Sequence, residues 1–274
     1  MSYDAIDNLE RCGYTDREAT FLYMVAVHSG YFLRRQFIES VKRERGGVAT
    51  SFLKKAMELG HLTALPCAEG RYIYHLHSKQ VYRLAGREDS QNRRLKSTPE
   101  IRRRLVALDY VLHHLGQEKF IESDEARQQL FSSLKVKPEA LHRTADFLPS
   151  VPTSFLQSED ALTVRFAFVD EARSTSRFAN FLDAYGGVIR ALERAVVAYV
   201  STSPMNFTAA ERLFERYMRL DRQRRTAARW VLSIWSAGWR RARGFIQDAG
   251  RLRRQTTSFY FRGRVSIVRP STWD

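Results

Sequence analysis

The chain has 274 residues, and 45 Lys or Arg against 30 Asp or Glu give it a formal net charge of +15. Its 44% hydrophobic content is that of a globular protein, so wholesale disorder is excluded. The sequence has no uncharged apolar run of the roughly 18 residues that a membrane span requires. Its acidic start, MSYDAIDNLER, is unlike a secretory signal peptide, and the length suggests two domains.

The two cysteines, Cys12 and Cys67, are too few for a disulfide scaffold and have no partners at metal-ligand spacing. We therefore expect free thiols in a reducing cytoplasm. The sequence has no G-x-S-x-G, P-loop, G-x-G-x-x-G or H-E-x-x-H motif, so we expect no metal, cofactor or small-molecule substrate. The positive charge favours a polyanionic partner, with nucleic acid ahead of an acidic membrane surface. The basic residues comprise 37 Arg and 8 Lys, an excess that a GC-rich genome also produces.

The first 86 residues predict helices followed by a hairpin. After a short leader at 1–14, Thr15 and Glu18 form a capping-box pattern at the start of an apolar helix that ends at Gly30. Further elements are expected in the order that follows: a helix at 33–40, a helix at 48–59, strands at 62–66 and 72–76, and a helical turn at 78–85. This order is typical of a winged helix-turn-helix, which presents a helix to the major groove of DNA.

The helix at 48–59 has two unlike faces when its residues are spaced at about 100° each. The apolar face is expected to comprise Val48, Ala49, Phe52, Leu53, Ala56 and Leu59. The polar face is expected to comprise Thr50, Ser51, Lys54, Lys55 and Glu58. Small hydroxyls near the helix start can meet base edges, and lysines can meet phosphates or guanine acceptors.

Further basic residues surround this helix and are candidates for phosphate contacts. The predicted DNA-binding set is Arg34, Arg35, Lys42, Arg43, Arg45, Thr50, Ser51, Lys54, Lys55 and Arg71, the last at the hairpin tip. The alternative is a winged helix that binds proteins, since every amphipathic helix has a solvated polar face.

A polar stretch without periodicity, 87–98, predicts a linker. Pro99 then opens a helix in which apolar residues recur at alternating steps of four and three: Ile101, Leu105, Leu108, Leu112 and Leu115. Such a seam packs against another helix, either within the chain or across a homodimer. Alternating strands and helices over 99–220 predict a mixed α/β domain, and hence an α+β protein overall.

The second half carries motifs of a known family. The winged-helix pattern, the polar linker, the helix IRRRLVALDYVLHH and the segments VPTSFL and LTVRFAFVDEARST together resemble the replication-relaxation family over roughly residues 15–220. These proteins are encoded on plasmids and other mobile elements. The resemblance implies a DNA-binding accessory protein whose second domain is similar to the PD-(D/E)xK restriction-endonuclease-like fold but often lacks its catalytic set.

The catalytic set of such nucleases is incomplete here. It needs carboxylates on neighbouring strands and a lysine around Mg²⁺. Thr153 occupies the position where an acid follows proline, Phe168 stands where an acid alternates with Asp170, and no lysine follows Lys137. We therefore expect no catalysis, although a metal-dependent nuclease that uses Asp170 and Glu171 remains the enzymatic alternative.

The segment 221–274 is rich in arginine, and 13 Arg against four acids between 211 and 254 give a local charge of +9. Its tryptophans, Trp230, Trp235 and Trp239, are expected to be core or interface anchors, or to stack exposed bases. The sequence thus predicts a cytoplasmic, non-catalytic, homodimeric protein that binds double-stranded DNA. It would act as a transcriptional regulator or as a replication or mobilisation accessory factor, with an adaptor for other proteins as a third possibility.

Overall fold

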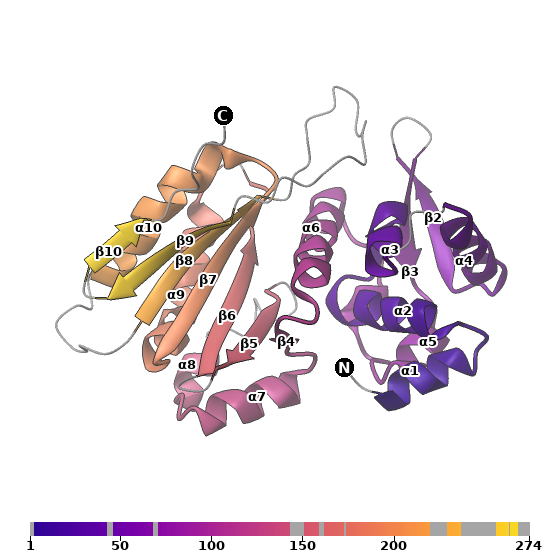
Figure 1. Cartoon of the computed structure of the whole chain (residues 1–274), viewed down its shortest axis with the longest axis horizontal. Coiled ribbons are helices and arrows are strands. Elements are labelled where there is room, and N and C mark those ends of the chain that lie inside the picture. Colours follow the sequence, from indigo (N-terminus) through magenta and orange to yellow (C-terminus); the bar gives the residue numbers. More distant parts are fainter. Residues whose placement is uncertain are drawn as a thin grey trace. The chain divides into compact units, whose positions relative to one another are not determined.

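The computed structural model describes residues 3–42, 46–67, 71–142, 151–158, 162–172, 174–219, 229–236, 256–262 and 264–267 (Figure 1). The described residues form two compact units, the first comprising those up to 112 and the second comprising those from 113 onward. Helices and strands occur in both units, which confirms the predicted α+β class. Cys12 and Cys67 are free thiols, as predicted.

The first unit combines helices with a three-stranded antiparallel sheet of order β1-β3-β2. Its elements are α1 (Tyr3–Glu10), α2 (Asp16–His28), β1 (Tyr31–Leu33), α3 (Arg34–Ser40), α4 (Gly46–Glu58), β2 (Leu62–Pro66), β3 (Tyr72–Leu76), α5 (Lys79–Leu84), the 3-10 turn η2 (Gln91–Arg93) and α6 (Thr98–His114). The two strands of the hairpin, β2 and β3, have the bounds that the sequence predicts. The predicted capping box of Thr15 and Glu18 is also present at the start of α2.

The expectation of a short leader at 1–14 is wrong, because this segment contains helix α1. Ala5, Ile6 and Leu9 of α1 are buried, and the helix packs against α2 and α5. The three apolar residues are spaced to lie on one side of a helix, so a periodic signal was present although the segment is short.

Four phenylalanines hold the helices of the first unit together. Phe37 of α3 and Phe52 of α4 stack with their ring centroids 4.2 Å apart. Phe21 of α2 meets Phe37 edge to face at 5.2 Å and Phe32 of β1 at 5.0 Å. All four rings are buried, and each removes a large apolar area from water. This cluster fixes which side of α4 faces the interior.

The segment predicted as a linker, 87–98, is instead part of the first unit. The buried amide of Asn92 donates hydrogen bonds to the carbonyl oxygens of Ala26 (3.0 Å) and Val27 (2.9 Å) near the end of α2. These carbonyls belong to the last turn of the helix and need partners from outside it. The boundary between the compact units falls after Leu112, within α6.

The apolar seam of α6 is used inside the first unit over its first turns. Ile101 and Leu105 pack in one cluster with Tyr31 and Leu33 of β1, and Leu108 is fully buried. Packing within the chain therefore accounts for these positions, and a homodimer remains a prediction.

The second unit is built on a seven-stranded sheet of order β10-β9-β8-β7-β6-β5-β4. Its elements are β4 (Lys119–Phe120), α7 (Asp124–Ser133), α8 (Pro138–His142), β5 (Thr153–Gln157), β6 (Leu162–Val169), α9 (Ser176–Ala191), β7 (Arg194–Ser201), the 3-10 turn η4 (Pro204–Asn206), α10 (Phe207–Arg219), β8 (Arg229–Ser236), β9 (Thr256–Arg262) and β10 (Arg264–Ile267). Strands β6, β7 and β8 are parallel, and the other pairs are antiparallel.

The segment 221–274 supplies strands of this sheet and is not a separate arginine-rich piece. β8 pairs with β7 in parallel from Arg194↔Arg229 to Ser201↔Ser236, and β9 and β10 extend the sheet. The mostly apolar run at 230–235 is typical of a buried strand. The side chains of Trp230, Trp235 and Trp239 lie outside the described part of the chain.

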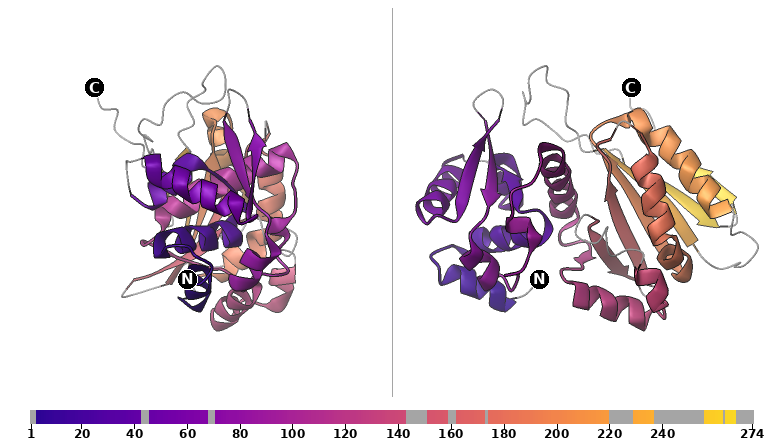
Figure 2. Two further views of the ribbon diagram at one scale, coloured as in Figure 1. Left: turned by 90° about the vertical axis from the view of Figure 1, so that its right-hand side faces the viewer. Right: turned by 180° about the vertical axis from the view of Figure 1, so that it is seen from behind.

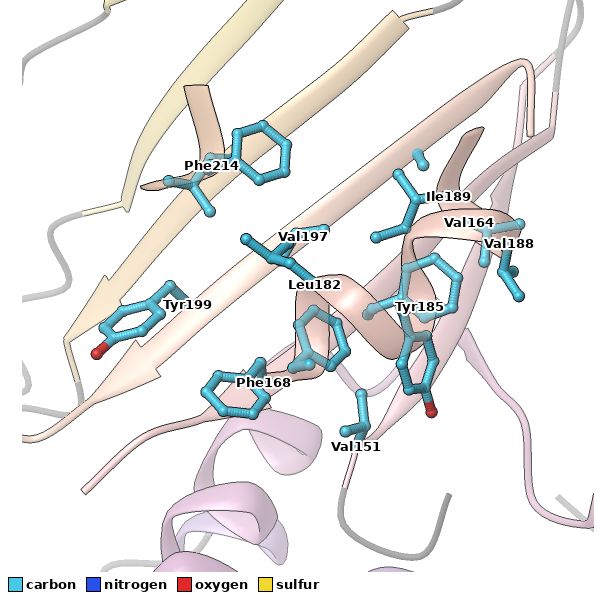
Figure 3. Packing of buried hydrophobic residues seen from close by; sticks show 14 of the residues in the cluster. Val151, Val164, Phe168, Leu182, Tyr185, Val188, Ile189, Val197, Tyr199 and Phe214 are labelled. Carbon is cyan, nitrogen blue, oxygen red and sulfur yellow. The ribbon is translucent and has the colours of Figure 1, made fainter. Parts of the chain in front are cut away.

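Helices α9 and α10 connect the parallel strands and lie side by side on one face of the sheet (Figure 2, right). Aromatic and aliphatic residues fill the core between them and the sheet (Figure 3). Phe168 of β6 contacts Phe178 and Phe181 of α9, at 5.4 Å and 4.9 Å between ring centroids. Phe168 is therefore an apolar core residue.

A substitution at Gly30 tests how tightly the segment 87–98 packs against the rest of the first unit. Its φ is +79°, and a β-carbon there would lie 2.1 Å from the carbonyl oxygen of Asn92. Gly86 also has a positive φ, +67°, but open space around it. We expect Gly86→Ala to lower the free energy of unfolding by about 1 kcal/mol, the cost of the left-handed backbone alone. Gly30→Ala should lower it several times more in urea titrations; equal effects would contradict the close packing.

Two buried histidines make the first unit sensitive to acid. Burial lowers the pKa of His28 to about 3, and the charge of Arg87 adds to the effect. Burial also lowers the pKa of His75 to about 4, with a further contribution from His77. The ring of His75 stacks on Tyr31 at 4.4 Å.

We expect the unfolding free energy to fall as the pH drops below 6.5. The two histidines bind protons there in the unfolded chain, whereas in the folded chain burial keeps them neutral. Each histidine contributes about 1.4 kcal/mol per pH unit between 6.5 and its folded pKa. His75→Phe keeps the stacked ring and removes the titration. Its unfolding free energy, followed by circular dichroism from pH 7 to 5, should fall less steeply than that of the wild type. An unchanged slope would show that His75 does not cause the effect.

Candidate nucleic-acid interface

Helix α4 turns the predicted polar face outward. Ala49, Phe52, Leu53 and Ala56 are buried, whereas Gly47, Thr50, Ser51, Lys54, Met57 and Glu58 are exposed. The hairpin strand β2 packs beside the helix (Figure 1). Leu59, expected on the apolar face, follows the last residue of α4 and is 48% exposed. We call the exposed residues Thr50, Ser51 and Lys54 the outward face of α4.

Lys54 projects from this face. It forms an ion pair with Glu58, one turn along α4, with Nζ 3.8 Å from the carboxylate, and both side chains are largely exposed. An exposed pair of this kind contributes little stability, because water screens it and both chains lose freedom. The ammonium of Lys54 can therefore exchange this partner for a phosphate at small cost.

Lys55, predicted beside Lys54 on the same face, points back into the first unit. Its ammonium is paired with the carboxylate of Glu18 on α2 and donates to the carbonyl oxygen of Gly13 at 2.9 Å. It also lies 5.0 Å from the centre of the Tyr14 ring. Glu18 is only 10% exposed, so the pair is shielded from solvent. Lys55 thus holds α4 against the start of α2.

Tyr14 extends this contact to the end of α4. Its hydroxyl is 2.7 Å from Nδ1 of His61, just after the helix. Burial raises the pKa of Tyr14 and lowers the pKa of His61, so both side chains are uncharged near neutral pH. A neutral hydrogen bond and an ion pair together fix the helix whose other face is exposed.

Arg35 is likewise engaged inside the first unit. Its guanidinium is 2.5 Å from the carboxylate of Asp109 on α6, whose side chain is 6% exposed. Gln36 donates to the same carboxylate at 2.8 Å and to the carbonyl oxygen of Leu105 at 2.8 Å. The sequence carried a signal for this contact, because Asp109 is an acid on the apolar side of a helix, and a buried acid needs a basic partner.

Arg34, the first residue of α3, reaches the outward face. Its guanidinium donates to the hydroxyl of Thr50 at 3.1 Å, and both side chains are exposed. Its positive charge also acts on Tyr74 of β3. Burial raises the pKa of Tyr74, and the charge of Arg34 partly offsets this rise. Arg34 therefore lies where α3, α4 and β3 meet.

The remaining predicted residues are Lys42, Arg43, Arg45 and Arg71. Lys42 is exposed in the turn between α3 and α4 and has a φ of 50°, in the left-handed region. Arg43 and Arg45 fall outside the residues that the structure describes. Arg71 is half-buried at the start of β3, and its carbonyl oxygen accepts a hydrogen bond of 2.7 Å from the backbone N–H of Cys67 across the hairpin.

Asp170 and Glu171, the two carboxylates that a metal-dependent nuclease would use, instead hold loops in the second unit. Asp170, fully buried after β6, accepts hydrogen bonds from the hydroxyl of Tyr199 (2.8 Å) and the backbone N–H of Ala172 (2.9 Å). Burial and the adjacent Asp170 raise the pKa of Tyr199, which keeps the phenol protonated. Glu171 accepts from the backbone and the hydroxyl of Thr202, at 2.7 and 2.6 Å. These bonds tie the end of β6 to the end of β7.

Across the residues that the structure describes, no group of three or more His, Cys, Asp or Glu side chains is arranged to hold a metal ion. None of the helices in the described ranges is long and apolar enough to cross a membrane. Comparison of the chain with protein-family models, with curated proteins and with solved structures gives no match. The resemblance to the replication-relaxation family therefore stays a prediction.

The adjacent lysines of α4 give a matched test of the geometry. Lys55→Ala removes the partner of a shielded carboxylate and should lower the unfolding free energy by about 1–3 kcal/mol. Lys54→Ala removes only an exposed pair and should change it by less than about 0.5 kcal/mol. Urea titration of both variants measures the difference, and equal stabilities would contradict the inward position of Lys55.

Proposed function

We propose that this protein binds double-stranded DNA without catalysis, through the outward face of α4. The observation that carries the proposal is that this helix is fixed on one side by Phe52 and Lys55 while Thr50, Ser51 and Lys54 remain exposed. A helix that reads the major groove needs a rigid attachment and a polar, basic surface that reaches base edges and phosphates.

The order of elements supports a winged helix-turn-helix for the first unit. Helices α2, α3 and α4 precede the β2–β3 hairpin, and β1 joins that hairpin to form the sheet β1-β3-β2. In such a domain α4 is the recognition helix, α3 lies across the backbone, and the hairpin is the wing. Arg71, close to the tip of the hairpin, then contacts the backbone beside the recognised groove.

The net charge of +15 supports a polyanionic partner. Binding to phosphates releases counterions, so the affinity of such a protein falls steeply with salt. The basic residues proposed to meet phosphates or bases are Lys54 on the outward face, Arg34, which contacts Thr50, and Lys42 in the turn between α3 and α4. Arg35 and Lys55 are left out of the proposed contact set, because their charges are used by Asp109 and Glu18.

The second unit is proposed to be a scaffold, similar to a degenerate restriction-endonuclease-like domain. The hydrogen bonds of Asp170 and Glu171 support this, since both carboxylates are used to join strand ends. We propose membership of the replication-relaxation family and a cytoplasmic role, with transcriptional regulation ahead of replication or mobilisation. A homodimer that binds a pseudo-palindromic site is part of the same proposal.

Lys42 offers a test that separates binding from stability. For a lysine, a left-handed φ is strained, and glycine relieves the strain. Lys135, with a φ of 56° after α7, is the matched control in the second unit. We expect Lys42→Gly and Lys135→Gly to leave the unfolding free energy unchanged or raise it by up to about 1 kcal/mol. Lys42→Gly should also weaken binding to a duplex and reduce the log–log salt slope by about 0.9.

Binding to a mixed-sequence 30-base-pair duplex is measured by fluorescence anisotropy between 50 and 300 mM NaCl. Lys135→Gly should bind as the wild type does, and Lys54→Ala should bind more weakly. If the wild-type protein does not bind the duplex at 50 mM NaCl, the proposal fails and a protein-binding adaptor becomes the better interpretation. Equal affinities of the Lys42→Gly and Lys135→Gly variants would remove Lys42 from the interface.

A further inference from the structure

We propose that Arg94 and Lys96 form a second surface of the first unit that binds DNA phosphates, separate from the outward face of α4. Both residues lie between η2 and α6, in the stretch of chain that packs against the end of α2. The inference rests on the proposed function and adds to it a second duplex, which the first unit holds at the same time as the duplex at α4.

Positive charge is concentrated around these two residues. The stretch 93–104 has the sequence RRLKSTPEIRRR, which contains six basic residues and one acid. That acid, Glu100, is paired with Arg103 and Arg104, one turn further along α6. Within the described part of the chain, Arg94 and Lys96 form no ion pair. Their charges are therefore left for an anion from outside the protein.

The cations of this stretch are close enough to act on one another. Burial lowers the pKa of Lys96, and the like charges of Arg104 and Arg94 lower it further. Arg104 is buried and donates to the carbonyl oxygen of Ser29 at 2.8 Å, so its position is fixed. Crowded positive charges create a potential that attracts anions, and a phosphate between them offsets their repulsion.

A single tyrosine hydroxyl fixes the backbone between the two cations. The hydroxyl of Tyr31 donates to the carbonyl oxygen of Arg94 at 3.1 Å and accepts from the backbone N–H of Lys96 at 2.9 Å. The ring of Tyr31 is buried and stacks on His75. Leu95, between the two bonded residues, is 70% exposed, so the segment 94–96 projects from the surface. A segment fixed beforehand loses little freedom when it binds a ligand.

The three-stranded sheet separates the segment 94–96 from α4. Successive residues of a strand point to opposite faces of a sheet. Phe32 of β1 faces Phe52 of α4, with their ring centroids 6.1 Å apart, whereas the preceding residue, Tyr31, reaches the segment 94–96. The two surfaces therefore lie on opposite sides of the sheet, and a duplex bound at α4 leaves the segment 94–96 accessible to another duplex.

A bridging experiment tests this surface. A biotinylated 30-base-pair duplex on beads is saturated with protein and washed, and the capture of a second, fluorescent duplex is measured at 50 mM NaCl. We expect the wild-type protein to capture the second duplex and the double variant Arg94→Ala/Lys96→Ala to capture it roughly tenfold less, because phosphate contacts contribute most at low salt. Binding to a single duplex, measured by anisotropy, should weaken less than about twofold, because α4 still binds it.

The double variant Arg17→Ala/Arg83→Ala is the matched control. It removes two exposed arginines elsewhere in the first unit and has the same net charge as Arg94→Ala/Lys96→Ala. This control should capture the second duplex as the wild type does. Equal losses in the two double variants would show that capture follows net charge alone, and the proposal would be wrong.

The contribution of Tyr31 is tested by Tyr31→Phe, which keeps the ring that stacks on His75 and removes only the hydroxyl. Because both cations remain but their backbone is no longer fixed, we expect several-fold weaker capture of the second duplex. Its affinity for a single duplex and its circular dichroism spectrum should match those of the wild type. Full capture by Tyr31→Phe would contradict the role assigned to this hydroxyl.

The outcomes separate this inference from the proposed function. If the wild-type protein binds one duplex but captures no second one, the inference is wrong while DNA binding stands. A homodimer that bridges duplexes through two copies of α4 would keep its capture in Arg94→Ala/Lys96→Ala, which also overturns the inference. If the wild-type protein binds no duplex at 50 mM NaCl, the proposed function fails and this inference with it.

An acidic membrane is the other polyanion that such a surface could meet. Cosedimentation with vesicles of phosphatidylcholine and phosphatidylserine, compared between the wild type and Arg94→Ala/Lys96→Ala, tests it. If the double variant loses vesicle binding but still captures the second duplex, the surface is a membrane contact and the inference is wrong. Loss of duplex capture alone supports DNA.

Discussion

The packing of Phe37 against Phe52 is the interaction on which the candidate interface depends. These rings, 4.2 Å apart, join the two helices that flank the turn between α3 and α4. Phe21 and Phe32 close the cluster from α2 and β1, so three helices and the sheet share one core. Thr50 and Lys54 are each two positions from Phe52, about 200° around the helix, so the burial of Phe52 turns them away from the core. The exposure of Thr50 and Lys54 is a consequence of that core.

Two buried acids, Asp109 and Glu18, each bind a basic residue inside the first unit, while other basic residues stay exposed. Asp109 draws Arg35 inward, and Glu18 does the same with Lys55. Breaking such a pair leaves a shielded carboxylate without compensation, so these basic residues are committed to the fold. Lys54 is instead paired with an exposed carboxylate one turn away, that of Glu58. Neighbours in the sequence therefore have different tasks, and net charge overestimates how many cations are available to a ligand.

In the second unit, too, a buried carboxylate is bound by groups of the fold itself. Asp170 lies at the end of a parallel strand, a place where α/β proteins commonly bind ligands. Its carboxylate is instead satisfied by Tyr199 on the neighbouring strand and by the turn that follows it. Phe168, at the alternate inward position, belongs to the aromatic core with α9 (Figure 3). Both features stabilise a sheet whose proposed task is to carry the DNA-binding unit.

The sequence by itself determined the elements with strong local signals. The hairpin strands 62–66 and 72–76, the capping box at Thr15 and the faces of 48–59 all follow from periodicity or turn chemistry, which act between near neighbours. The inward turn of Lys55, the packing of 87–98 and the strands within 221–274 depend on partners far along the chain. Only the tertiary structure decided these, because the local pattern of a segment does not say which distant segment supplies its ion-pair partner or its neighbouring strand.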